Sequence, residues 1–532
     1  MKKQRTREVY LPMKKLIGLL ILLVSLCSDT FGAQTLALNK GDHICYLGNA
    51  LADRMQHDGW LETLIYAKFP QLDLVFRNLA ASGDEVATWH RSENFGSRDE
   101  WLTKTKADVI FAFYGFNESF KGPGGLEKFK SDLDKFLKEM KAKNFSGMGA
   151  PRVVLFSPIA NEKINDPDLP DPGLNNSHLE LYTTAMRDVA KANEVMFVDL
   201  FSVSQRFYAG AAKQGRPLTF NTFMLTEAGN KALAPEIFRA LFNEPSPGGD
   251  FEKLRAAVLD KCNEWHARYR TVDGYNVYGG RSKLTFPRAG KESPMISNFE
   301  VMQEEMTQRD TKTENRDKRI WAVARGGDMK VDDSVLPLVE TMESNKQDVS
   351  PYLSGEEAIQ HMTPAKGCKV ELFASEDRFP ELAKPVQMAF DTKGRLWVAV
   401  WPNYPERTPT STKGDSLLIF EDTNGDGKAD KVIHYIDGLN CPTGFQFYKD
   451  GVLVMQAPDL WFVRDTNHDD HADWKERVLM GMDSADSHHT ANSMVLDPGG
   501  ATYLSDGVFH RTQVETADGP VRNMDACIYR FE

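Results

Sequence analysis

The sequence contains little cysteine, and none of it stands in a spacing typical of a metal or redox motif. Six cysteines occur among 532 residues, without a CxxC or CxxCH pair. This scarcity excludes a structural zinc site of the cysteine type, a thioredoxin-type redox motif and an attached c-type haem. Cys45 lies in a predicted core strand, where a cysteine behaves as a small buried hydrophobe.

The chain also lacks an excess of positive charge. Lys and Arg total 64 against 76 Asp and Glu, which gives a net charge of -12. A nucleic-acid-binding surface requires basic stripes that neutralise phosphates, so no nucleic-acid partner is expected. A hydrophobic content of 41% is typical of a globular protein, and the length predicts several domains.

No hydrophobic run is long enough for a membrane-spanning helix. The run LIGLLILLVSLC extends from Leu16 to Cys27, whereas a span needs about 20 residues. A basic pair precedes this run and small residues follow it, which is the pattern of a secretory signal peptide over residues 1–33. We expect export to the periplasm or the cell exterior, with no membrane span after signal removal. An uncleaved anchor, and a start at Met13 instead of Met1, stay open as alternatives.

Between residues 34 and 245, short apolar runs alternate with helical segments. The runs HICYLG, LDLVFRN, ADVIFAFYG, PRVVLFSP and VMFVDLF are rich in β-branched and aromatic residues, and segments such as GGLEKFKSDLDKFLKEMKAK separate them. Continuous apolar strands that alternate with helices indicate a parallel sheet covered on both faces. We predict a three-layer α/β domain of flavodoxin-like type over residues 34–245.

The next segment, residues 246–364, is more polar and more charged. Two stretches in it have a helical pattern, FEKLRAAVLDKCNEWHARYR and MQEEMTQRDTKTENRDKRIWAVA, and a stretch rich in glycine and turn formers separates them. This composition predicts a helical and irregular connector.

Residues 365–532 change to short strands and turns with an internal repeat. The segments PVQMAFDTKGRLWVAV, PTGFQFYKDGVLVMQ and ANSMVLDPGGATYLS share an apolar pair, a glycine turn and an alternating strand. Their spacing of about 50 residues is typical of β-propeller blades. About three blades fit before Glu532, fewer than a closed ring requires. We therefore predict a multidomain protein that ends in a partial all-β propeller, in a truncated or unusually built chain.

Four short blocks in the first domain point to its chemistry. HICYLG leads into Gly-Asn-Ala-Leu with Ala50, FRNLAASGDEV contains Gly83, YGFNES contains Asn117, and FNTFMLTEAGN contains Asn221 and Met224. These blocks resemble those of the SGNH (GDSL-type) esterases and acylhydrolases. The resemblance implies that Ala50 stands at the nucleophile position, that Gly83 and Asn117 belong to an oxyanion hole, and that Asn221 and Met224 occupy the aspartate and histidine positions.

By this resemblance the triad has lost its chemistry, whereas the oxyanion donors are retained. Alanine offers no nucleophile, methionine accepts no proton at neutral pH, and asparagine has no imidazolium to stabilise. We predict a module without the usual esterase activity that binds a carbohydrate or ester ligand. One alternative is an active esterase or deacetylase with a rebuilt base, drawn from His43, His57, Asp84, Glu93 and Glu118. Misassignment of the fourth block, the least specific one, is another.

Two acidic loops in the last region follow the spacing of a calcium loop. Positions 1, 3, 5 and 9 of that pattern are filled by Asp422, Asn424, Asp426 and Asp430 in the first loop, and by Asp465, Asn467, Asp469 and Asp473, with Glu476 at position 12, in the second. Oxygen ligands at alternating positions suit Ca²⁺. Hairpin turns rich in Asp, Asn and Gly produce the same pattern, so both interpretations stay open.

A histidine pair opens the last repeat, in DSADSHHTANSMVLDPGGATYLS. This segment resembles soluble quinoprotein sugar dehydrogenases of the glucose and sorbosone types, which use pyrroloquinoline quinone (PQQ) with calcium. The resemblance implies that His488 or His489 is the base that takes the proton of a substrate hydroxyl. Packing or hydrogen bonding at a blade edge is the alternative role for the pair.

The order of the two resemblances is similar to that in large exported planctomycete-type proteins. Besides the binding module and the rebuilt esterase, two further functions stay open. One is a quinone-dependent sugar or alcohol dehydrogenase, if the propeller is completed beyond residue 532. The other is an interaction scaffold without a small ligand. The substrate and the oligomeric state do not follow from the sequence.

Overall fold

The computed structural model describes residues 34–272, 274–290, 294–343, 351–405 and 407–531. The predicted signal peptide, residues 1–33, lies outside the described residues. Among those described, no helix combines the length and the apolar character that crossing a membrane requires.

A five-stranded parallel sheet forms the centre of the first part of the chain. Its strands are β1 (His43–Gly48), β2 (Val75–Asn78), β3 (Val109–Phe113), β4 (Arg152–Phe156) and β5 (Met196–Val198). They lie in the order β2-β1-β3-β4-β5, and every neighbouring pair is parallel. This is the strand order of flavodoxin, so the prediction of an α/β domain with a parallel sheet is confirmed.

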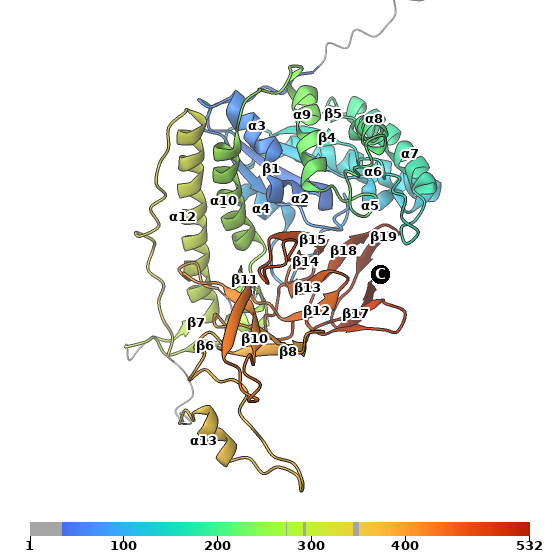
Figure 1. Ribbon diagram of the computed structural model, residues 1–532. Helices are drawn as coiled ribbons and strands as arrows, with labels where there is room; N and C mark the ends of the chain where they lie inside the picture. The colour runs from blue at the N-terminus through green and yellow to red at the C-terminus, as the bar shows by residue number, and fades with distance from the viewer. Residues whose placement is uncertain (1–33, 273, 291–293, 344–350, 406, 532) are drawn as a thin grey trace, which may run out of the picture.

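Helices pack on both faces of this sheet (Figure 1). They are α2 (Ala50–Asp58), α3 (Trp60–Lys68), α4 (Arg98–Lys104), α5 (Phe116–Ser119), α6 (Gly122–Ala142), α7 (Gly173–Ala192), α8 (Leu200–Ala212) and α9 (Glu227–Phe242). Ile44 and Tyr46 of β1 belong to one hydrophobic cluster, and Cys45 and Leu47 belong to the other. Because successive side chains of a strand face opposite ways, both faces of β1 are buried, and its sequence is therefore apolar throughout.

The segment predicted as a connector contributes two long helices, α10 (Glu252–Tyr269) and α12 (Asn298–Ala324), which run side by side along the α/β domain (Figure 1). Two buried ion pairs join these helices to the domain. Arg77 of β2 binds Asp317 of α12 at 2.6 Å, and Glu62 of α3 binds Lys261 of α10 at 2.6 Å. The helices thus share the core of the α/β domain. Between them lie α11 (Gly274–Val277), the 3-10 helix η1 (Gly280–Lys283), β6 (Thr285–Phe286) and β7 (Ile296–Ser297).

Small antiparallel sheets make up the last part of the chain, after α13 (Gly355–Gln360). The first sheet contains β8 (Pro385–Phe390), β9 (Leu396–Val400), β10 (Asp415–Glu421) and β11 (Lys431–Leu439); the second contains β12 (Gly444–Tyr448), β13 (Gly451–Gln456), β14 (Asp459–Arg464) and β15 (Trp474–Met480); the third contains β16 (Met494–Leu496), β17 (Thr502–Asp506) and β20 (Cys527–Phe531). Each of the three sheets begins with one of the three repeat segments, which form β8 and β9, β12 and β13, and β16 and β17. No closed ring of blades is seen in the described part of the chain, so the propeller stays a prediction.

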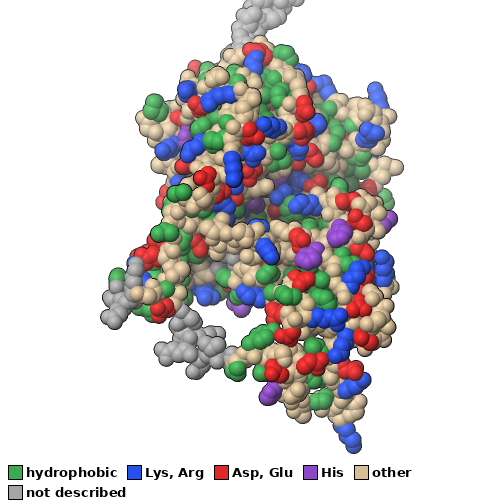
Figure 2. All heavy atoms as spheres, turned by 60° about the vertical axis from the view of Figure 1, so that its left-hand side comes forward, with side chains coloured by type: hydrophobic (Ala, Val, Ile, Leu, Met, Phe, Trp, Pro, Cys, Tyr) green, Lys and Arg blue, Asp and Glu red, His purple; other side chains and the backbone are tan. Residues whose placement is uncertain are grey.

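A two-stranded hairpin, β18 (Gln513–Thr516) and β19 (Gly519–Arg522), is inserted between β17 and β20. It stands apart from the third sheet and reaches up to the α/β domain (Figure 1). Elsewhere the two parts leave a hollow between them, and basic and acidic side chains are interspersed over the face that Figure 2 shows.

Candidate functional site

The site predicted from the SGNH resemblance lies where β1, β2 and β3 end. β1 stops at Gly48, which has a φ of 125° and approaches Phe113 so closely that a Cβ would lie 1.9 Å from the Phe113 carbonyl oxygen. Asn49 then caps α2 by accepting a hydrogen bond from Leu51 N. Ala50 is the first residue of this helix, and the first N–H groups of a helix have no acceptor within it. The sharp turn therefore presents the Ala50 N–H to an acceptor outside the helix.

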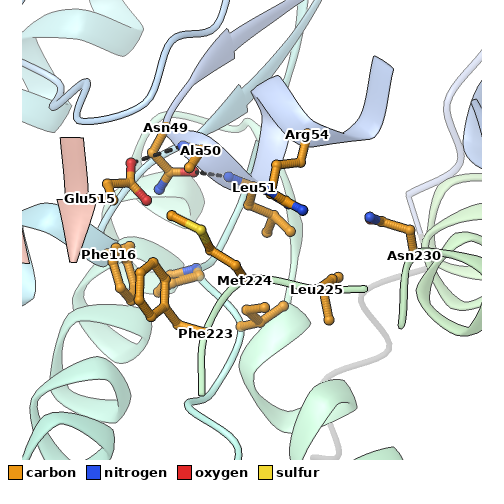
Figure 3. A pocket seen from close by; sticks show the side chains of 12 residues that line it. Asn49, Ala50, Leu51, Arg54, Phe116, Phe223, Met224, Leu225, Asn230 and Glu515 are labelled. Carbon is orange, nitrogen blue, oxygen red and sulfur yellow. Dashed lines mark hydrogen bonds between the residues drawn. The ribbon is translucent and has the colours of Figure 1, made fainter. Parts of the chain in front are cut away.

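Two more donors converge with Ala50 N on one point. Gly83 N follows β2, and the side-chain amide of Asn117 comes from α5, after β3. All three groups donate to Oε1 of Glu515, at 2.8, 2.8 and 2.9 Å. Figure 3 shows the Glu515 side chain extending from β18 toward Ala50. The two residues predicted for an oxyanion hole, Gly83 and Asn117, thus lie beside the Ala50 N–H, and all three bind a carboxyl group of the same chain.

The Glu515 carboxyl group is fully enclosed by this contact. Glu515 is 2% exposed, and this burial raises the pKa of its carboxyl group to about 7. The hydrogen bonds from Ala50, Asn117 and Gly83 act in the opposite direction, because they favour the ionised form. The negative charge of Asp84 raises the pKa further. The group therefore changes its charge close to neutral pH.

The rest of the hairpin is held on the α/β domain by polar contacts around Glu515. Glu515 N donates to Ser82 Oγ at 3.1 Å, and Gln513 Nε2 donates to Asp84 Oδ1 at 2.7 Å. On the second strand, Arg522 donates to the Gly83 carbonyl oxygen and forms an ion pair of 3.0 Å with Glu85. Every one of these partners lies in the loop after β2. The hairpin and this loop form one polar interface.

What remains of the pocket is small and mostly apolar. Its volume is about 20 Å³, close to the space of one water molecule. Ala50 and Met224 both line it, and Met224 lies between Ala50 and the rings of Phe116 and Phe223 (Figure 3). None of the described lining residues carries a hydroxyl, a thiol or an imidazole; they are Asn49, Ala50, Leu51, Arg54, Phe116, Pro158, Ile159, Phe223, Met224, Leu225, Asn230 and Glu515.

Asn221 holds the backbone of the fourth block. Its Oδ1 accepts a hydrogen bond of 2.9 Å from Met224 N, so its side chain closes the turn that carries Met224. Asn221 does not line the pocket. The fourth block nevertheless reaches the same pocket as Ala50, because Met224 belongs to its lining.

Neither histidine weighed as a rebuilt base lines this pocket. His43 lies at the start of β1, at the opposite end of the strand, where its Nδ1 is 2.8 Å from the Thr105 carbonyl oxygen. His57 lies near the end of α2, and its ring meets that of His266 edge to face, with the ring centroids 4.9 Å apart.

The three acidic residues considered as a rebuilt base also lie outside this pocket. Asp84 forms an ion pair of 2.7 Å with Arg91, Glu93 is exposed, and Glu118 accepts hydrogen bonds from two backbone nitrogens, including Gly115 N at 2.9 Å. Burial raises the pKa of Glu118 to about 7. None of the three lines the pocket beside Ala50.

The two acidic loops connect β10 to β11 and β14 to β15. In each loop the first aspartate accepts hydrogen bonds from backbone N–H groups of its own turn: Asp422 from Gly425 at 2.7 Å, and Asp465 from Asp470 at 2.8 Å. The side chain of Glu476 is turned away from its loop and binds Arg54 of α2 at 2.5 Å. Side-chain oxygens that close their own turns are typical of Asx turns. Calcium binding by these loops stays a prediction.

The histidine pair lies between the second and third sheets. His488 lines a cavity of about 330 Å³, and its Nδ1 is 2.7 Å from the hydroxyl of Tyr404. His489 is bound to Asp486 at 2.9 Å and does not line this cavity. The structure therefore separates the two candidates and brings only His488 to a cavity.

Comparisons with known proteins match two different parts of the chain. A family described as a domain of unknown function, DUF7133, matches residues 354–532. No curated protein is similar to the chain in sequence.

Solved structures match the α/β part. BT4096, a gut microbial diltiazem-metabolizing enzyme, is 18% identical with a TM-score of 0.32, over 40% of this chain and 49% of its own, so the chain spans about half the length of that protein. A catalytic mutant of Axe2, an acetylxylan esterase from Geobacillus stearothermophilus, is 17% identical with a TM-score of 0.31, over 40% and 100%. LAE5, an alpha/beta hydrolase from the metagenome of Lake Arreo, Spain, is 16% identical with a TM-score of 0.31, over 38% and 96%. Similarity at this level assigns no role to any residue here.

Glu515 is the residue that the sequence did not reveal. It stands in the hairpin QVETADGPV, 465 positions after Ala50. The alternation of polar and apolar residues along such a hairpin indicates only which side chains share a face. No local signal marks one glutamate of the hairpin as the partner of a distant pocket.

Proposed function

We propose that the α/β domain is an SGNH-like module that does not hydrolyse esters and that uses its oxyanion donors to fasten the β region of the same chain. The observation that supports this proposal is the convergence of Ala50 N, Gly83 N and the Asn117 amide on Glu515 Oε1. An oxyanion hole binds a partly negative oxygen by directed N–H groups. A carboxylate offers such an oxygen in the ground state.

With the pocket occupied by Glu515, an ester carbonyl cannot bind to the three donors. The three donors are already bound, and the remaining volume of about 20 Å³ is too small for a carbohydrate or an ester. The pocket also lacks a nucleophile at Ala50 and a base at Met224. In this proposal the ligand of the pocket is internal, and its function is to join the two parts of the protein.

The test is a set of full-length variants assayed for hydrolysis of p-nitrophenyl acetate. The wild type and the triple variant Ala50→Ser, Asn221→Asp, Met224→His are expected to be inactive, because Glu515 still occupies the hole. Adding Glu515→Ala to the triple variant empties the hole and is expected to give measurable hydrolysis. Adding Asp518→Asn instead changes an exposed acid of the same hairpin and is expected to leave the triple variant inactive. Hydrolysis by the wild type, or by the triple variant with Glu515 in place, contradicts the proposal.

A second proposal concerns the cavity beside His488. We propose that it takes a small polar ligand of the carbohydrate class, because aromatic and amide side chains line it, including Trp401, Gln387 and Asn492. Titration calorimetry with a panel of sugars tests this, with Asn492→Ala as the variant. Absence of saturable binding contradicts it.

The quinone implied by the dehydrogenase resemblance does not fit this cavity well. PQQ carries three carboxylates, and none of the described lining residues is Lys or Arg. Buried carboxylates need cationic or N–H partners, so we derive no step through the quinone. Dehydrogenase activity of the β region stays a prediction. Dye reduction with added PQQ and calcium checks it.

A further inference from the structure

A second cluster of chemically active side chains lies on α2, away from the Glu515 pocket. Asp53 and His57 are four residues apart and therefore share one face of the helix. His266 of α10 packs against the same face, with its ring centroid 4.9 Å from that of His57. Ligand atoms of the three side chains all lie within 4.8 Å of one another. Within the described ranges, no other three His, Cys, Asp or Glu side chains have ligand atoms this close together.

Several polar atoms around this cluster have no hydrogen-bond partner among the described residues. They include Nε2 of His57, Oε1 of the neighbouring Gln56 and Oδ1 of Asp459 on β14, all of them buried. Asp459 is 2% exposed, and its charge acts on both Asp53 and His266. Buried polar atoms normally have a partner, so this group of unpaired atoms indicates a ligand such as water or a cation.

The three side chains are of the types that bind transition metals. A neutral imidazole offers a nitrogen lone pair, and an ionised carboxylate offers oxygen lone pairs. Metal binding selects these forms of the side chains and releases their protons.

Two of the arginines near the cluster are paired with carboxylates. Arg54 binds Glu476 at 2.5 Å, and Arg477 binds Asp459 at 2.6 Å. The charge of a third, Arg270, acts on Asp53 and His266. The Asp53 carboxylate accepts hydrogen bonds from Gln56 Nε2 at 2.8 Å and from the backbone nitrogen of Ser82 at 3.3 Å.

The cluster borders a cleft through His57. This side chain lines a cleft of about 500 Å³ between the α/β domain and the β region, together with Arg54, Asp58 and residues of β14 and β15. Asp53 and His266 do not line the cleft and lie behind His57.

We infer that Asp53, His57 and His266 bind a divalent transition metal of the zinc class, with a remaining coordination position facing the cleft. Two imidazoles and one carboxylate are a ligand set that Zn²⁺ accepts, and three protein ligands leave a position for water or a ligand. The same set suits Fe²⁺. The inference is independent of Glu515 and of the proposed function of the α/β domain.

The test measures metal content directly and needs no enzyme assay. Metal-free full-length protein is incubated with Zn²⁺, freed of excess ion and analysed by mass spectrometry, in the presence and absence of competing Fe²⁺. The wild type is expected to retain about one equivalent per chain. His57→Gln, His266→Gln and Asp53→Asn are each expected to lose most of it. His361→Gln, which removes an exposed histidine on the surface, is expected to retain it.

Two further readouts separate loss of the site from loss of the fold. Added Zn²⁺ is expected to raise the Tm of the wild type and of His361→Gln, but not that of the three ligand variants. Co²⁺ in place of Zn²⁺ is expected to give d–d absorption bands that His266→Gln abolishes. If the wild type contains no zinc after incubation with Zn²⁺ and removal of the excess ion, the inference is overturned. Unchanged zinc content in all three ligand variants overturns it as well, because the ion would then be bound elsewhere.

Discussion

Oε1 of Glu515 lies 2.8 Å from the backbone nitrogen of Ala50, although the two residues are 465 positions apart in the sequence. The contact joins a hairpin of the last part of the chain to the first turn of α2 in the first. Where the SGNH resemblance places a catalytic nucleophile, this protein has a helix N–H bound to its own carboxyl group. The predictions below follow from this contact and from the packing around it.

Removal of the Glu515 side chain should destabilise the protein. Glu515→Ala leaves Ala50 N, Gly83 N and the Asn117 amide without this acceptor, and a buried donor without a partner costs about 1–3 kcal/mol. Because water can enter the vacated space, we expect a total loss of roughly 2–4 kcal/mol in the free energy of unfolding. Urea denaturation near pH 6 measures it.

Two variants bracket this effect. Glu515→Gln keeps an oxygen acceptor and should lose less stability than Glu515→Ala. Asp518→Asn alters an exposed acid in the turn of the same hairpin, and its effect should stay within about 0.5 kcal/mol. Equal stability of Glu515→Ala and Asp518→Asn would show that the contact contributes nothing.

Glu515 should also make stability depend on pH. Its pKa is raised to about 7 in the folded protein, whereas an unfolded glutamate titrates near 4.3. Between these values the folded state binds the extra proton, so the stabilisation is complete below the lower pKa and is lost as the pH rises through about 7. A difference of this size corresponds to roughly 4 kcal/mol at most.

The measurement is the difference in Tm between wild type and Glu515→Gln from about pH 5 to pH 8. Glutamine does not titrate, so the difference isolates Glu515 from other buried acids such as Glu118. The wild type should lose stability relative to the variant as the pH rises. A constant difference, or one of the opposite sign, would contradict the raised pKa.

Gly481 should be required for docking of the hairpin. Its φ is 102°, and a Cβ there would lie 1.9 Å from the carbonyl oxygen of Gln513 in β18. Gly481→Ala should therefore displace β18 and increase hydrogen exchange at its amides. Gly500→Ala is the matched control, because Gly500 also has a positive φ, of 95°, but has nothing within 4 Å of the added atom. Similar exchange in both variants would attribute the effect to backbone strain alone.

The α/β part of the fold was predictable because its strands carry a strong local signal. HICYLG and ADVIFAFYG are mostly apolar runs. A strand that is buried on both faces requires consecutive apolar residues, such as those around Ile44 and Phe111. The proximity of Gly83 and Asn117 was also predictable, since both stand in short blocks next to strand ends.

The remaining features depend on contacts between distant segments. Glu515, Asp459 and His266 are ordinary residues in their own elements, and only packing brings them to α2 or its first turn. The polar composition of residues 246–364 predicted a connector. In a sequence this rich in charge, the buried charged residues of α10 and α12 cannot be distinguished from the exposed ones. Lys261 and Asp317 look like surface residues until Glu62 and Arg77 are seen beside them.

The ion pair between Arg77 and Asp317 should be essential for attaching α12 to the sheet. Arg77 donates to both carboxylate oxygens of Asp317, at 3.2 and 2.6 Å, and the two side chains are 9% and 3% exposed. Asp317→Asn leaves a buried guanidinium without its counterion, which should cost about 3–5 kcal/mol. Guanidinium chloride obscures ion pairs by its own ionic strength, so urea denaturation is the suitable measurement.

The double variant Arg77→Met, Asp317→Leu removes both charges and should lie much closer to the wild type, because no unpaired charge remains in the core. Asp132→Asn provides the surface control. It breaks the exposed pair between Lys128 and Asp132 on α6, which should cost less than about 1 kcal/mol. If Asp317→Asn proved as mild as Asp132→Asn, the ion pair would contribute little to the attachment of α12 to the sheet. A large loss in Asp317→Asn that the double variant restores would instead make α12 part of the cooperative core of the α/β domain.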